Sequence, residues 1–215
     1  MGAKTWMVVA SDQPAKDVFR SKPQLNAERS EQLAHLLFPH DRLQRLEDVS
    51  LAYACPPDNE LVIGCFGSVT VVAAKEFGID YLSKIPTHFH SVLNSPYVYA
   101  HAMHSVVDWF AYAVWRNSEL VRALSLSPDS GLLEDIGEKL DFEVPYWEGQ
   151  HPATDPEDPE DTYPFVFHPL DLGEAALDNL FGYVLEGFTK PEQIEPEEFP
   201  LLAFKRSRNS WWKFW

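Results

Sequence analysis

The sequence predicts an α+β fold in which an antiparallel or mixed sheet with hairpins is covered by a few helices. Two pairs of apolar, β-rich runs are each joined by a short polar turn, which is typical of β-hairpins. Other segments repeat leucines every three or four residues, as on the buried side of a helix. Hydrophobic residues make up 45% of the 215 residues, which is ordinary for a globular protein.

The chain begins with a predicted strand followed by a helix. Residues 4–10 combine Trp, Met and two Val before a Ser-Asp-Gln-Pro stop, which indicates a buried strand. Residues 26–38 place leucines on one face, and Asn26 is the candidate N-cap, because its side chain can accept a hydrogen bond from a free backbone N–H. We expect this helix to end before Pro39.

Two hairpins are predicted from turn chemistry. The runs 61–66 and 69–74 flank Gly67-Ser68, and the runs 109–115 and 120–126 flank the polar turn Arg116-Asn117-Ser118-Glu119. The second pair is rich in aromatic and β-branched residues, which favour strands.

The remaining segments complete the predicted layout. Residues 82–93 indicate a short helix, and residues 97–103 indicate a strand. Residues 148–162 are rich in Pro, Asp and Glu, so we expect an exposed, extended loop. A last helix is expected over residues 173–181, with Asp171 as its cap.

We expect one core domain over residues 1–187, which includes the acidic loop, and a C-terminal extension over residues 188–215. The residues expected to contribute to the core are Trp6, Val8, Leu36, Ile63, Val71, Trp109, Tyr112, Val114, Leu124 and Leu180.

The net charge of −16 argues against nucleic-acid binding through a basic surface and favours a basic protein partner. The N-terminal apolar run is too short for a signal peptide, and no run approaches the roughly 20 apolar residues of a membrane span. We therefore expect a cytoplasmic protein in which Cys55 and Cys65 stay reduced. The glycine-rich phosphate-binding motifs are missing from the sequence, and no cofactor is predicted.

Two groups of side chains are candidates for chemistry. His101, His104 and Asp108 would share one face of a helix and could hold a metal there, but on a strand the two histidines point to opposite sides. We favour the strand, because the neighbouring residues are aromatic and β-branched. Glu134 and Asp135 are weak candidates for a catalytic carboxylate pair.

The segment 204–215 differs from the rest of the chain, because it holds four basic residues, five aromatic residues and no acidic residue. So many aromatic side chains would form an apolar patch if they were left exposed. We expect the tail to dock on its own acidic body, on a neighbouring subunit of a homo-oligomer, or on a partner; insertion at a membrane interface is the remaining alternative, although the stretch is short for stable anchoring. The residues expected to make that contact are Trp211, Trp212, Phe214 and Trp215.

Three stretches carry a resemblance: residues 1–7 (MGAKTWM), 101–110 (HAMHSVVDWF) and 124–131 (LSLSPDSG). With them, the chain resembles a family of uncharacterised bacterial proteins from residue 1 to about residue 187. The resemblance implies no activity, cofactor or catalytic residue. The hairpin from Trp109 to Pro128 is also similar in style to strand pairs of small, acidic, immunity-type domains, which is an analogy of fold alone.

Together, these observations favour a noncatalytic acidic interaction or immunity-like protein that binds a basic partner. The alternative is a small metal-assisted enzyme centred on His101, His104 and Asp108.

Overall fold

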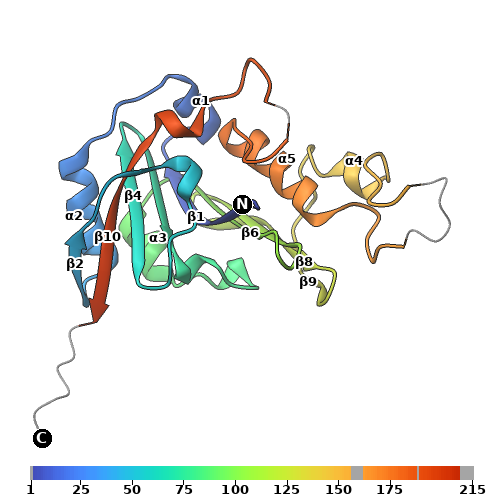
Figure 1. The fold of residues 1–215 in the computed structure, drawn as a ribbon, viewed down its shortest axis with the longest axis horizontal. Coiled ribbons are helices and arrows are strands. Elements are labelled where there is room, and N and C mark those ends of the chain that lie inside the picture. The colour runs from blue at the N-terminus through green and yellow to red at the C-terminus, as the bar shows by residue number, and fades with distance from the viewer. Residues whose placement is uncertain (1, 156–161, 188, 209–215) are drawn as a thin grey trace, which may run out of the picture.

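The computed structural model describes residues 2–155, 162–187 and 189–208, which form an antiparallel sheet with helices on both faces (Figure 1). The strand order is β2-β10-β4-β5-β1-β6-β7-β8-β9, and β3 pairs with β10 beside this path. The strands are β1 (Lys4–Ser11), β2 (Asp41–Arg45), β3 (Val49–Ser50), β4 (Glu60–Phe66), β5 (Val69–Ala74), β6 (Tyr97–His104), β7 (Trp109–Arg116), β8 (Glu119–Ser127), β9 (Gly131–Ile136) and β10 (Pro200–Arg208). The predicted α+β class is confirmed.

Both predicted hairpins are present. β4 pairs with β5 around Gly67, and β7 pairs with β8 around Asn117 and Ser118. The last two residues have φ values of 49° and 69°. A two-residue turn with both central residues in the left-handed region matches the natural twist of a hairpin, which explains the tight connection.

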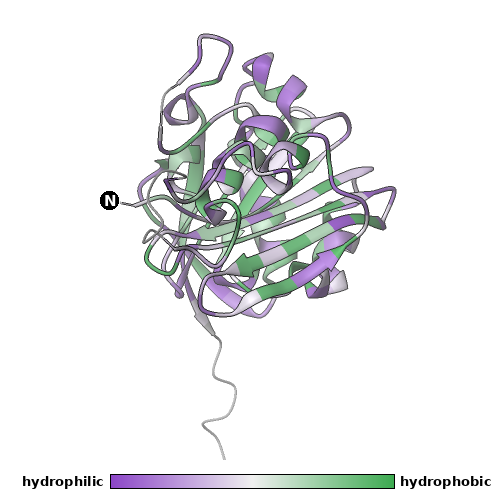
Figure 2. Ribbon diagram, turned by 90° about the vertical axis from the view of Figure 1, so that its right-hand side faces the viewer, coloured by the Kyte–Doolittle hydropathy of each residue, from purple (hydrophilic) through white to green (hydrophobic). Residues whose placement is uncertain are grey.

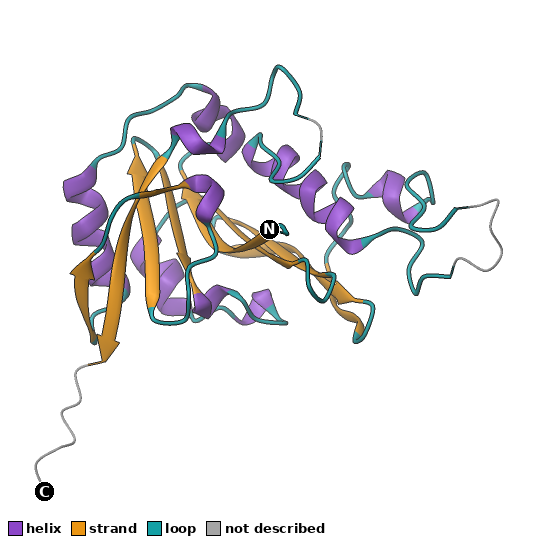
Figure 3. Ribbon diagram, in the orientation of Figure 1, coloured by secondary structure: helices purple, strands orange, loops and turns teal. Residues whose placement is uncertain are grey.

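Helices cover the sheet on both faces, and the drawing by secondary structure shows them above and below the strands (Figure 3). They are α1 (Ala15–Arg20), α2 (Ala27–Leu37), α3 (Thr87–Leu93), α4 (Val144–Trp147) and α5 (Pro169–Phe181). Helices α1 and α5 pack on the face that carries Met7, Val9 and Tyr112. Helices α2 and α3 pack on the other face, with Val8 and Ile63. Because side chains alternate along a strand, β1, β4, β5, β6, β7, β8 and β10 each supply residues to both cores.

Helix α2 begins as predicted, because the Asn26 side chain accepts a hydrogen bond from the Arg29 N–H at 2.9 Å. The prediction that Leu36 belongs to the core is wrong, because Leu36 is 62% exposed, whereas Leu37 is buried. Adjacent helix positions point about 100° apart, so only one of the two leucines can face the sheet. The other expected core residues are buried, except Trp6 and Trp109, which are half-buried.

Two helix boundaries differ from the prediction. The stretch 82–93 divides into a 3-10 turn at Leu82–Lys84 and α3, because Pro86 restricts the residue before it to extended geometry. Helix α5 is capped by His168, whose Nδ1 accepts from the Leu170 N–H at 3.3 Å, with Pro169 at the first helical position. The predicted cap, Asp171, lies inside the first turn instead.

The strand β10 is the main feature that the sequence did not indicate. It lies between β2 and β4, with Phe204 opposite both Arg45 and Leu61, so the boundary expected at residue 187 does not separate the sheet from the C-terminal extension. Arg206 reaches Asp41 at 2.7 Å and Glu76 at 2.6 Å. The part of the basic tail up to residue 208 is thus a strand of the sheet, and residues 209–215 lie outside the described residues.

Hydropathy follows the layers, with hydrophobic colour concentrated along the strands and hydrophilic colour on outer helix surfaces and loops (Figure 2). Within the described part of the chain, no helix has the length and apolar character that a membrane crossing requires. The centre of the predicted acidic loop, residues 156–161, lies outside the described residues, and Glu148, Gln150 and Thr162 beside it are exposed.

Candidate functional site

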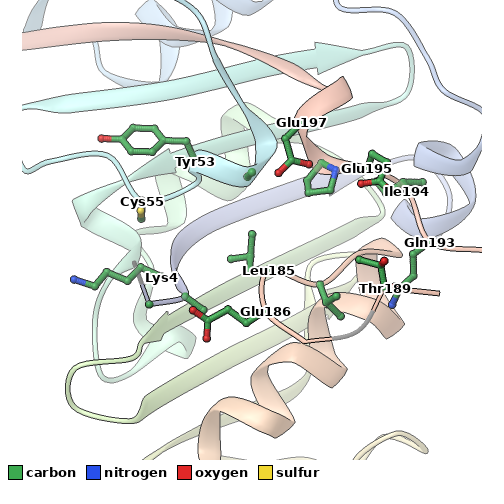
Figure 4. Close-up of a pocket in the computed structure, with 15 residues that line it drawn as sticks. Lys4, Tyr53, Cys55, Leu185, Glu186, Thr189, Gln193, Ile194, Glu195 and Glu197 are labelled. Carbon is green, nitrogen blue, oxygen red and sulfur yellow. The ribbon is translucent and has the colours of Figure 1, made fainter. Parts of the chain in front are cut away.

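A pocket of about 440 Å³ lies where the start of β1 meets two segments that are distant in sequence. One is the turn Leu51–Tyr53 with Cys55 after it, and the other is formed by residues 184–187 and 189–197, which we call the strap. Tyr53 and Cys55 lie on one side and Thr189, Gln193 and Ile194 on the other, with Leu185 between them (Figure 4). We call this the strap pocket. Its volume is within the range of about 300–1,000 Å³ that is usual for ligand sites.

The strap pocket combines an apolar wall with a charged rim. Its apolar lining residues are Ala3, Ala52, Val184, Leu185, Ile194 and Pro196. Three carboxylates line it as well, those of Glu186, Glu195 and Glu197, and all three residues are exposed. Lys4 is the one basic residue among the described residues that line it, and its side chain extends outward on the Cys55 side (Figure 4). The lining therefore favours a ligand with an apolar body and a positive charge.

The strap is fastened to α5 by a carboxylate. Glu174 accepts hydrogen bonds from the Leu185 N–H at 2.7 Å and the Glu186 N–H at 3.2 Å. Burial raises the pKa of Glu174 to about 7, although these two hydrogen bonds act in the opposite direction. Glu174 also lines a neighbouring hollow of about 530 Å³, which shares Val184 and Gln193 with the strap pocket. The position of the strap thus depends on a carboxylate that titrates near neutral pH.

The thiol and phenol in the pocket are held in their protonated forms. Burial raises the pKa of Cys55, and the ammonium of Lys4 only partly opposes this effect. Burial also raises the pKa of Tyr53, with further contributions from Cys55 and Glu60. A thiol acts as a nucleophile through its thiolate, so this environment does not activate Cys55. The arrangement is suited to binding.

The structure does not bring His101 and His104 together. His101 is fully buried on the α5 face, where Nδ1 lies 2.6 Å from Thr5 Oγ1 and Nε2 lies 3.0 Å from the Gly173 carbonyl oxygen. Burial lowers its pKa to about 4, so the imidazole is neutral. His104 lies on the opposite face and stacks on Trp6. The favoured strand assignment places them as the structure does, and His101 acts as a bridge from the sheet to α5.

Asp108 pairs with a residue that sequence reasoning did not select. Its Oδ2 lies 3.5 Å from His168 Nε2, and the Tyr163 ring stacks on His168. The contact links the turn between β6 and β7 to the start of α5. Across the described residues, no group of three or more His, Cys, Asp and Glu side chains could hold a metal ion. The histidine and aspartate candidates therefore do not form a metal centre.

Glu134 and Asp135 point to opposite sides of β9, so they do not act as a pair. Glu134 is buried and accepts hydrogen bonds from the Ser83 N–H and hydroxyl. Asp135 lies 2.5 Å from Arg122 Nη1. Alternation along a strand separates neighbouring side chains in this way. Each carboxylate fastens a different segment to the sheet.

A fully buried ionic cluster joins β7, β8 and the segment before α4. Arg122 contacts Glu143 through two parallel hydrogen bonds, from Nε at 2.8 Å and from Nη2 at 2.7 Å. Glu143 also accepts hydrogen bonds from the Tyr112 hydroxyl and the Leu140 N–H. Burial raises the pKa of Tyr112, and the carboxylate of Glu143 raises it further. Because both charged side chains are 0% exposed, the cluster is a structural anchor.

The strap pocket could not be found from local patterns, since its walls come from residues about 130 positions apart. The only local signals were the proline-rich and acidic composition of residues 190–200 and the single cysteine before Pro56.

A search of curated proteins finds no match to the chain, and neither does a search of solved structures. One family model, described as a family of unknown function, matches residues 5–204. This confirms the resemblance seen in the sequence and extends it beyond residue 187, into β10. The chain therefore belongs to the family of unknown function DUF6928.

Proposed function

We propose that the chain is a noncatalytic binding protein that engages a basic protein partner through the strap pocket. The observation that carries the proposal is the lining of this pocket, in which an apolar wall adjoins the carboxylates of Glu186, Glu195 and Glu197. A lysine or arginine side chain has a matching character, with an apolar stem and a charged end. Binding that blocks a basic partner would make the protein immunity-like.

Two further observations support the proposal. The net charge of −16 attracts a basic partner over long range and raises the association rate at low salt. The protonated thiol of Cys55 is consistent with a pocket that binds without covalent chemistry. A cytoplasmic location is part of the same proposal.

A defined probe tests this function: an octapeptide of alternating lysine and leucine, with a version that carries glutamine in place of lysine as its control. The variant Glu186→Gln, Glu195→Gln, Glu197→Gln should raise the Kd for the lysine peptide by about tenfold at low salt. The difference should shrink at 1 M salt, where the screening length is about 3 Å. Isothermal titration calorimetry measures both values.

The matched control removes the same charge elsewhere, through Glu31→Gln, Glu47→Gln and Glu119→Gln, three residues that are exposed and do not line the strap pocket. If both triple variants bind the peptide equally, general acidity explains the binding and the pocket assignment is wrong.

The C-terminal tail remains a separate proposal, because Trp211, Trp212, Phe214 and Trp215 lie outside the described residues. We propose that these side chains contact a partner or a second copy of the chain. Ending the chain after Arg208 keeps β10 whole and removes only residues 209–215. Sedimentation velocity should then show a smaller species or weaker partner binding. Unchanged sedimentation and partner affinity would contradict the proposal.

A further inference from the structure

A second hollow, of about 370 Å³, lies on the face of the sheet opposite the strap pocket, and we call it the aromatic hollow. It forms at the ends of β1, β6, β7 and β8. Its lining residues are Trp6, Gly78, Asp80, His104, Val107, Trp109, Ser127, Asp129 and Ser130.

Two tryptophans of the hollow are held by their indole N–H groups. Trp6 Nε1 donates to the Pro56 carbonyl oxygen at 3.0 Å, and Trp109 Nε1 donates to Ser125 Oγ at 3.2 Å. Both residues are half-buried. Since their N–H groups are already bonded to the protein, what the indoles can offer to a ligand is their π-surface. The electron-rich face of an indole attracts cations.

The charges of the hollow favour the same ligand. Asp80 and Asp129 are exposed, and the described residues that line the hollow include no lysine or arginine. His104 stacks on Trp6 with ring centroids 6.4 Å apart, and its Nδ1 accepts from the Val106 N–H. Burial and the nearby Lys4 lower the pKa of His104, so the imidazole adds no positive charge at neutral pH.

The chain uses this type of contact beside the hollow. The Lys84 ammonium lies 4.0 Å from the centre of the Tyr81 ring, next in sequence to Asp80. A lysine ammonium over an aromatic ring is therefore a contact that the chain already makes one residue away from Asp80.

We propose that the aromatic hollow binds the ammonium or guanidinium group of a lysine or arginine side chain on a basic protein partner. The charged group lies against the indoles of Trp6 and Trp109, and Asp80 and Asp129 balance its charge. This site is independent of the strap pocket, because it shares no lining residue with it and occupies the other face of the sheet.

The test uses the full chain labelled with 5-fluorotryptophan and followed by ¹⁹F NMR, in which Trp6→Phe and Trp109→Phe assign the two signals. The probes are acetyl-Gly-Lys-Gly-amide and acetyl-Gly-Arg-Gly-amide, and the control peptide carries norleucine, which has a similar length and no charge. We expect both basic peptides to shift the Trp6 and Trp109 signals with saturation, and the norleucine peptide to leave them in place.

A pair of charge variants sharpens the test. Asp80→Asn with Asp129→Asn should raise the Kd at least fivefold, whereas Asp12→Asn with Asp141→Asn, two exposed residues outside the hollow, should leave it unchanged. Because all four aspartates are exposed, these variants are expected to fold. The proposal is overturned if the norleucine peptide shifts the same signals equally, if other indoles respond instead, or if both variant pairs behave alike.

Discussion

Two glutamates fasten two loops of this molecule, and they do so under opposite electrostatic conditions. Glu143 is fully buried and holds the segment before α4 through Arg122, Tyr112 and Leu140. Glu174 is partly buried and holds the strap through the N–H groups of Leu185 and Glu186. In the described structure Glu143 faces a guanidinium, whereas the charges that affect Glu174 are the carboxylates of Glu186 and Asp171.

The comparison shows that the surroundings of a carboxylate decide whether the loop that it holds is fixed or adjustable. The carboxylate of Glu143 has a guanidinium as its partner, and two parallel hydrogen bonds from Arg122 fix its position. A partly buried carboxylate that accepts only from neutral donors loses hydration without gaining a counter-charge, so its pKa rises. The Glu143 cluster should act as an anchor, and the Glu174 contact should respond to pH.

The largest effect is expected from Arg122→Met, which leaves the buried carboxylate of Glu143 without its cation. Breaking a buried pair from one side costs about 3–5 kcal/mol in the free energy of unfolding. The double variant Arg122→Met, Glu143→Leu should recover much of this loss, because no buried charge remains. Urea denaturation measures both, and equal stability of the single and double variants would show that the charge is not the cause.

The second effect concerns pH and the strap. The pKa of Glu174 is about 7 with the strap closed, above its ordinary value of 4.5. An open strap hydrates the carboxylate and returns the pKa toward the ordinary value, so protonation favours the closed strap. Closure is therefore strongest at low pH and weakens as the pH rises through 7. Between pH 8 and pH 6 the closed-to-open ratio should increase about tenfold.

Hydrogen exchange of the Leu185 and Glu186 amides, corrected for intrinsic rates, measures this ratio. Glu174→Gln cannot ionise, so its protection should not vary with pH in this range. Equal pH dependence in both proteins would remove Glu174 as the cause.

A smaller effect is expected from Asp135→Asn, which alters the outer contact of Arg122. Asp135 lies 2.5 Å from Nη1, but Arg122 keeps both hydrogen bonds to Glu143. We expect a loss of about 1 kcal/mol in urea denaturation, the usual contribution of one hydrogen bond. A loss as large as that of Arg122→Met would mean that the two carboxylates share the anchoring role.

The smallest effect is expected from Glu198→Gln. Glu198 pairs with Lys22 at 2.6 Å, and their side chains are 52% and 64% exposed. Exposed ion pairs contribute about 0–1 kcal/mol, because water and salt screen them. The melting temperature should stay within about 1 °C of the original, and a clear drop would show that surface pairs matter more here than the comparison assumes.

The parts of the fold that could be predicted are those specified by neighbouring residues. The turn at Asn117-Ser118 and the cap at Asn26 depend on contacts within a few positions, and both predictions are confirmed. The start of α5 was available by the same logic, because proline favours the first helical position, but Asp171 was predicted as the cap and His168 takes that position. Leu36 was misplaced because leucines at 33, 36 and 37 leave the exact direction of the apolar face open.

The features that could not be predicted depend on contacts between residues that are distant in sequence. Strand β10 pairs with β4, about 140 positions earlier, and its apolar start followed by basic residues also fits a tail. For the site, the alternation along β6 gave the opposite directions of His101 and His104. It could not give the partner of Asp108, because His168 lies 60 positions away. The strap pocket was missed for the same reason, because its walls come from distant parts of the chain that meet only after the sheet has formed.

The position of β10 also has a consequence for synthesis on the ribosome. Within the described residues every other strand precedes it in the chain, yet it lies between β2 and β4. Until residues 200–208 have left the exit tunnel, β4 presents an open edge next to Leu61 and Ile63, and β2 has no partner. An unpaired apolar edge is a template for association with other chains. The nascent protein should therefore be most prone to aggregation, and most dependent on chaperones, until strand β10 has been synthesised and has paired with β2 and β4.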